Sequence, residues 1–164
     1  MKILLILTTV LLSTTTFAKD LILSTDLMID YPEPILISHT QTSLILKYND
    51  WSLTHEIVNP KGIYQFADLT GVTEKFIISI FDEGVRKTLP SWLAALSSDQ
   101  ANAFSITRQN TKKQLVGSTK ILSVYDEKRS NGYLYLIEKL KIHHIVVHGS
   151  VLNFNMIINN IKER

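Results

Sequence analysis

Residues 131–161 read NGYLYLIEKLKIHHIVVHGSVLNFNMIINNI and carry the clearest structural signals in the chain. Asn131 and Gly132 form a dipeptide that favours tight hairpin turns. The runs 119–125, 133–138 and 142–148 are rich in aromatic and β-branched residues, as strands are. We therefore predict a hairpin that turns at Asn131 and Gly132, followed by a further strand over 142–148.

A helix is expected after this last strand. Gly149 and Ser150 mark the transition, because a serine can cap the first turn of a helix. The apolar residues that follow recur at the spacing of one buried helical face: Phe154, Ile157, Ile158 and Ile161. The sequence thus predicts a closing helix that reaches Ile161 and packs one face against the strands.

The first half of the chain contains a second predicted hairpin. Asn49 and Asp50 separate the β-forming runs 43–48 and 51–58, and a short polar pair in this position indicates a turn. Residues 35–37 form another β-like run after the segment 31–34, whose two prolines require extended backbone.

Between these β regions the apolar residues follow the period of a helix. Residues 73–82 place four of them on one stripe, with Gly84 as the expected stop: Phe76, Ile77, Ile80 and Phe81. A buried strand is the alternative for this run. Pro90 and Ser91 begin a second predicted helix, whose expected inward residues are Trp92, Leu93, Leu96 and Phe104.

These elements predict an α+β fold, with an antiparallel sheet of about five to seven strands covered by helices. The order of hairpin, strand over 142–148, Gly149 and Ser150, and closing helix resembles the end of PsbP-like domains. The resemblance covers roughly the last fifty residues and rests on pattern. It implies a binding module, accessory subunit or adaptor rather than an enzyme, and it transfers no site residue because no site motif matches.

Residues 1–18 have the three parts of a secretory signal peptide. Lys2 precedes an apolar stretch of about ten residues, and Ala18 ends a segment suited to cleavage. A membrane-spanning helix needs roughly twenty apolar residues, so stable membrane insertion is not expected. We predict that residues 19–164 form one domain, and the absence of cysteine favours the bacterial periplasm over a disulfide-stapled secreted module.

Composition excludes several functions. The 164 residues include 17 Lys or Arg and 15 Asp or Glu, and their spread leaves no cationic stripe for nucleic acid. Without cysteine there is no thiolate nucleophile and no zinc knuckle. No glycine-rich phosphate loop is present, and we expect no cofactor.

The five histidines do not predict a catalytic or metal site. His144 and His148 share one face of a strand but lie about 13 Å apart, too far to chelate one ion, and His143 faces the other way. A metal site would need His39, His55 or a carboxylate from elsewhere. The pair His55 and Glu56 begins like a zinc-protease motif, but Asn59 stands where the second histidine is required.

Exposed aromatic and charged residues are the candidates for binding a protein partner. Trp51 lies at one predicted hairpin tip, and Tyr133 lies on a strand face beside a second, charged tip. That tip comprises Asp126, Glu127, Lys128 and Arg129. The alternative is that the aromatic rings cover the sheet edges.

We predict an exported, non-catalytic protein-binding domain, for instance an immunity protein that neutralises a secreted toxin in the periplasm. Two other functions remain open. One is an accessory subunit of an envelope or secretion complex. The other is a small hydrolase whose residues meet only in three dimensions, which a pocket holding a histidine and a carboxylate within hydrogen-bond reach would favour.

Overall fold

The computed structural model describes residues 19–164, so the predicted signal peptide lies outside the described residues. The described part contains ten strands and four helices, which confirms the predicted α+β class. Their order is β1 (Lys19–Ile22), β2 (Leu27–Tyr31), β3 (Leu36–His39), β4 (Ser43–Lys47), β5 (Ser52–Ile57), α1 (Thr73–Phe81), α2 (Glu83–Arg86), α3 (Ser91–Ala103), β6 (Thr111–Val116), β7 (Thr119–Asp126), β8 (Asn131–Ile137), β9 (Ile142–His148), α4 (Val151–Asn159) and β10 (Ile161–Glu163).

The strands form two antiparallel sheets. The larger has seven strands in the order β3-β4-β5-β9-β8-β7-β6, and the smaller has three in the order β1-β2-β10. The predicted hairpin of residues 43–48 and 51–58 is confirmed as β4 and β5. Because β5 pairs with β9, the amino-terminal hairpins and the carboxyl-terminal strands join in one sheet.

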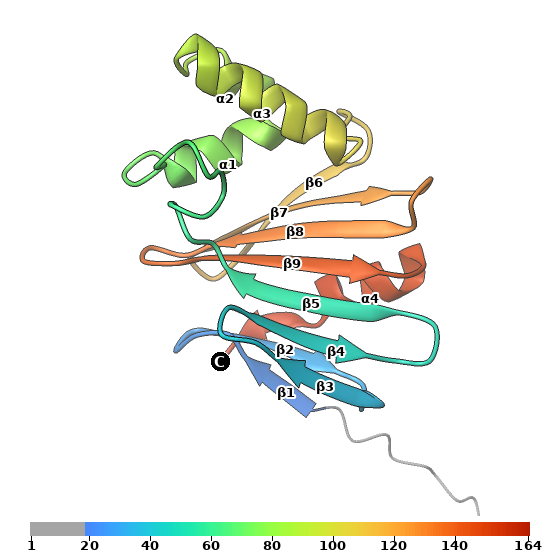
Figure 1. The fold of residues 1–164 in the computed structure, drawn as a ribbon. Coiled ribbons are helices and arrows are strands. Elements are labelled where there is room, and N and C mark those ends of the chain that lie inside the picture. The colour runs from blue at the N-terminus through green and yellow to red at the C-terminus, as the bar shows by residue number, and fades with distance from the viewer. Residues whose placement is uncertain (1–18) are drawn as a thin grey trace, which may run out of the picture.

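Helices α1 to α3 cover one face of the large sheet, while α4 and the small sheet lie on the other face (Figure 1). Each face has its own apolar core, because strand side chains alternate between the two faces. Leu53, Ile145 and Val147 belong to the core beneath α4 and the small sheet. Phe76, Leu122 and Tyr135 belong to the core beneath α1 and α3.

The helical layer agrees with its predicted apolar pattern, with two corrections. Residues 73–81 form a helix, α1, so the strand alternative for this run is wrong, and all four stripe residues are buried. Gly84 does not stop a helix but lies inside α2, because the Asp82 side chain accepts hydrogen bonds from the backbone of Gly84 and Val85 and begins a new helix there. Trp92 is exposed, whereas the buried residues of α3 are Leu93, Ser97 and Ala101.

The hairpin between β7 and β8 turns at the charged residues just before Asn131 and Gly132, not at these two residues. Asn131 pairs with Asp126 and Gly132 with Tyr125, so both residues of the expected turn belong to β8. The chain reverses over residues 127–130, where Ser130 adopts a positive φ of 52°. Asp126 favours this turn because its Oδ1 accepts hydrogen bonds from the backbone N–H groups of Lys128 and Arg129.

Gly132 is required for packing rather than for turning. A Cβ at this position would overlap the ring of Phe154 in α4. The glycine therefore lets a helical aromatic ring lie directly against the backbone of β8.

The closing helix ends two residues earlier than predicted. α4 stops at Asn159, and Ile161 begins β10 by pairing with Ile29 of β2. Two hydrogen bonds hold Asn160 beside β2, where the chain passes from α4 to β10. The Asp30 N–H donates to the Asn160 carbonyl over 3.1 Å, and Asn160 Nδ2 donates to the Asp30 carbonyl over 3.1 Å. Pairing with β2 satisfies backbone groups that a further helical turn would have paired internally.

We expect Gly132→Ala to lower the free energy of unfolding by about 2 kcal/mol, because Phe154 must move away from β8. Gly62→Ala is the control, since its Cβ would meet only the Asn59 side chain at an ordinary distance of 3.5 Å. Urea denaturation of both variants measures the difference, and equal stabilities would contradict the packing role of Gly132.

Candidate functional site

Trp51 does not form the surface anchor that its predicted position suggested. It is only 8% exposed and stacks on Tyr48, with ring centroids 3.8 Å apart and planes 3° from parallel. The short turn between β4 and β5 folds the two rings together against the core beneath α4. Trp51 therefore stabilises the hairpin, as the alternative of aromatic rings covering the sheet proposed.

Asp126 is likewise buried. Its Oδ2 accepts a hydrogen bond from Ser105 Oγ over 2.8 Å, and its Oδ1 holds the 127–130 turn. Burial alone would raise the pKa of this carboxyl, but the hydrogen bonds from Ser105 and from the backbone of Arg129 and Lys128 outweigh burial and lower it. Asp126 fastens the turn to the end of α3 instead of meeting a partner.

The rest of this predicted site is divided between structure and surface. Tyr133 is half-buried and stacks on Phe104, with centroids 4.1 Å apart. Glu127, Lys128 and Arg129 are exposed, and Arg129 also donates to the Ala103 carbonyl at the end of α3. These three remain predicted contact residues, and they lie on a turn that hydrogen bonds to Asp126 and Ala103 hold in place.

Two histidine contacts that the sequence did not predict lie on opposite faces of the large sheet. The strand β9 directs His143 and His144 to opposite sides, as its periodicity predicted. On the side of the small sheet, His143 Nδ1 lies 3.0 Å from His55 Nε2, and His143 Nε2 lies 2.9 Å from Glu138 Oε2. Ser24 Oγ donates to Glu138 Oε1 over 2.6 Å. These contacts form a row of hydrogen-bonded side chains, which we call the histidine row: His55, His143, Glu138 and Ser24.

The direction of these hydrogen bonds follows from the carboxylate at one end. Glu138 accepts from Ser24, so His143 donates from Nε2 to the other carboxylate oxygen. We assign His143 Nδ1 as the acceptor of a hydrogen bond from His55 Nε2–H, because a ring that carries its one proton on Nε2 leaves Nδ1 free to accept. Burial and the neighbouring His143 lower the pKa of His55 to about 4, so this ring is neutral at pH 7. The row links the β1–β2 turn, the end of β8 and β5.

On the helical side of the sheet, His144 forms a hydrogen bond with Glu56. His144 Nδ1 lies 2.8 Å from Glu56 Oε1, and this hydrogen bond lowers the pKa of the carboxyl. The imidazole stacks on Tyr135, with centroids 4.4 Å apart, and lies beside Phe104. Its Nε2 is buried and has no hydrogen-bond partner among residues 19–164.

Glu56 and His144 line a cavity of about 440 Å³ between the sheet and α1 and α3. Most of its walls are apolar or aromatic, with hydroxyl and amide groups from Thr42, Asn59 and Gln100. This is the pocket with a histidine and a carboxylate within hydrogen-bond reach that the hydrolase alternative requires.

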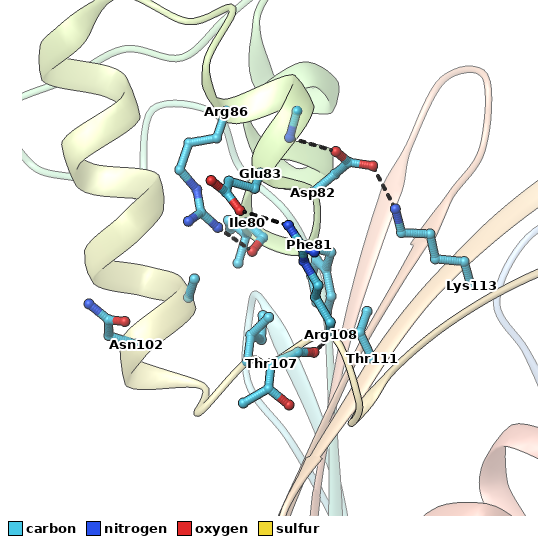
Figure 2. A pocket seen from close by; sticks show the side chains of 13 residues that line it. Ile80, Phe81, Asp82, Glu83, Arg86, Asn102, Thr107, Arg108, Thr111 and Lys113 are labelled. Carbon is cyan, nitrogen blue, oxygen red and sulfur yellow. Dashed lines mark hydrogen bonds and ion pairs between the residues drawn. The ribbon is translucent and has the colours of Figure 1, made fainter.

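A larger cavity of about 580 Å³ lies between the three helices and β6. Figure 2 shows the Asp82 and Glu83 carboxylates reaching toward Lys113 and Arg108, at 2.7 Å and 3.5 Å. Arg86 donates to the carbonyls of Ser79 and Ile80, which are at the end of α1. These charged groups serve contacts between elements, and the cavity offers a ligand few groups that are not already engaged.

Among residues 19–164 no strand pairs with the outer side of β3, and this free edge is unlike the rest of the sheet. All four of its residues are exposed, and Leu36 and Ile37 are 55% and 53% exposed. Thr40 N donates to Ser43 O at the β3–β4 turn. Because hydrogen-bonded pairs alternate in an antiparallel ladder, the backbone groups of Leu36 and Ser38 face β4, and those of Ile37 and His39 face outward.

Within residues 19–164, no three His, Asp or Glu side chains gather as a metal site would require, and no helix has the length and apolarity to cross a membrane. Comparison of the chain with protein-family models, with curated proteins and with solved structures found no match. The likeness to PsbP-like domains therefore remains a prediction.

Replacing His55 with Gln tests the buried histidine row. The folded pKa of about 4 lies below the ordinary value of 6.5, so the wild type loses stability as pH falls from 6.5 toward 4. The variant lacks this titration, and its amide can still donate to His143. We expect the stability gap between the two proteins to narrow by about 3 kcal/mol between pH 7.5 and pH 4. Urea denaturation across this range measures the gap, and a constant gap would contradict the account.

Proposed function

We propose that this chain is a protein-binding domain that works in the periplasm and takes up an extended segment of its partner along the free edge of β3. The exposed, uncharged edge strand is the observation that carries the proposal. A partner strand would use the outward backbone groups of Ile37 and His39, and its side chains would meet apolar residues on both faces.

The composition of β3 supports this function. Sheet edges in natural proteins are usually protected by charged residues, prolines or covering segments. Residues 35–46 contain no Asp, Glu, Lys or Arg, although three consecutive apolar residues in this run are exposed: Ile35, Leu36 and Ile37. Such an edge favours pairing with another strand.

The opposite edge of the same sheet provides the contrast. Strand β6 carries Lys112 and Lys113, and Lys113 forms an ion pair with Asp82 across to the helical layer. Leu115 is 70% exposed there, but it stands next to these cations rather than in an uncharged run. Strand pairing is therefore better favoured at β3 than at β6.

The predicted export signal is the reason for placing this binding function in the periplasm. A periplasmic domain that captures an extended segment suits an immunity protein that occludes a secreted toxin. It also suits an accessory subunit of an envelope complex, so the partner decides between them. A diffusible toxin as the partner supports the first, and a membrane assembly supports the second.

The pair of Glu56 and His144 favours a second candidate, a hydrolytic enzyme. A carboxylate that orients an imidazole is a common general-base arrangement. However, His144 Nε2 is buried among residues 19–164, so a substrate would reach it only after neighbouring side chains move. The geometry therefore supports binding better than catalysis.

We expect Ile37→Lys to weaken partner binding at least tenfold, because a buried cation in the added strand's interface is costly. Leu115→Lys, at the exposed edge on the other side of the sheet, is the matched control and should retain binding. Both residues are exposed, so both variants should keep wild-type stability within about 0.5 kcal/mol.

The measurement uses a partner captured from periplasm and from secretion-competent neighbouring cells, then purified and titrated against each variant. Hydrogen exchange locates the contact: the Ile37 and His39 amides should exchange rapidly alone and become protected in the complex. Equal affinity of both lysine variants, or unchanged exchange at these two amides, would overturn the edge site.

A further inference from the structure

The cavity beneath α1 and α3 has one charged group at its wall and is otherwise lined mostly by apolar and aromatic residues, with polar groups from Thr42, Asn59 and Gln100. Its volume of about 440 Å³ falls within the range of small-molecule sites. Of the described residues that line it, Glu56 is the only Asp, Glu, Lys or Arg. The walls come from β5, α1 and the end of α3, together with the loop after β5: Ile57, Val58, Ile63, Phe76, Ile77, Ile80 and Phe104.

His144 fixes the Glu56 carboxylate in this cavity. The imidazole is stacked on Tyr135 and bound through Nδ1 to Oε1, so one carboxylate oxygen has a set position. The Glu56 side chain is 43% exposed, and no Lys or Arg of residues 19–164 lies within ion-pair distance of its carboxylate. The second oxygen, Oε2, remains to accept a hydrogen bond from a bound molecule.

The negative charge of Glu56 and the apolar lining of the cavity determine which class of ligand fits. An anion would be repelled by the carboxylate. A divalent metal ion prefers several oxygen or nitrogen ligands, and within residues 19–164 no such group of three exists. An ammonium group would pair with Glu56, and an apolar body attached to it would fill the aromatic and aliphatic interior.

We propose that this cavity binds a small organic amine in its ammonium form, with Glu56 as the anionic anchor and the wall of α1 and α3 around the apolar part. His144 is a positioning residue, because it orients Glu56 while its own Nε2 stays enclosed. The proposal is independent of the β3 edge, since Glu56 lies on β5 and faces the helical layer.

The probe is 2-phenylethylamine, titrated into the isotopically labelled protein and followed by NMR. Its neutral isostere 2-phenylethanol shows how much the charge contributes. We expect saturable shifts at Ile57 and Phe104 with the amine, and at least tenfold weaker binding of the alcohol. This comparison needs no variant and stays valid if a substitution perturbs the fold.

Two variants then assign the anchor. Glu56→Gln keeps the shape and a hydrogen-bond acceptor but removes the charge, and we expect it to weaken amine binding at least tenfold. Glu127→Gln, on the exposed turn, should bind the amine as the wild type does. The edge variant Ile37→Lys should also bind it normally, so failure of either proposed site is distinguishable from failure of the other.

Equal affinity for amine and alcohol would overturn the proposal, as would unchanged amine binding by a folded Glu56→Gln variant. Shifts confined to residues outside the cavity, or no saturable shift at Ile57 and Phe104, would overturn it as well.

Discussion

The antiparallel pairing of β5 with β9 is the contact on which the other features depend. It opposes Leu53 to Val147 and Glu56 to His144, in strands about 90 positions apart in the sequence. Because strand side chains alternate, this register directs His55 and His143 toward the small sheet and Glu56 and His144 toward the helical layer. A slip of one residue would reverse both pairs and would expose the apolar residues of both cores.

The two polar clusters have different physical consequences. On one side, His55 and His143 connect β5 through hydrogen bonds to Glu138 and Ser24, so these polar groups have partners and join the two sheets. On the other side, His144 holds a carboxylate at the wall of a cavity. The first cluster stabilises the fold, whereas the second leaves an oriented anion that a ligand can use. The β3 edge is two strands away from Glu56 on β5, although Thr42 of the β3–β4 turn also lines the cavity.

Local patterns predicted most of the helices and strands. The stripe of α1 and the β4–β5 hairpin could be found because their signals lie within about fifteen residues. The turn prediction at Asn131 and Gly132 failed because Gly132 serves a contact with Phe154, which no local signal reveals. The sequence predicts exposed positions for Trp51 and Asp126 because turns are usually exposed, but ring stacking buries Trp51 and hydrogen bonds within the turn and to Ser105 accompany the burial of Asp126. The contact of His55 with His143 depends on the register of strands distant in sequence, so it could not be predicted.

Long-range ¹H–¹⁵N NMR of the histidine rings at pH 7 tests the β5–β9 register most directly. The account predicts that His143 carries its proton on Nε2 and that a coupling passes through the hydrogen bond from His55 Nε2 to His143 Nδ1. A His143 ring protonated on Nδ1, or rings of His55 and His143 that show no mutual coupling, would contradict it.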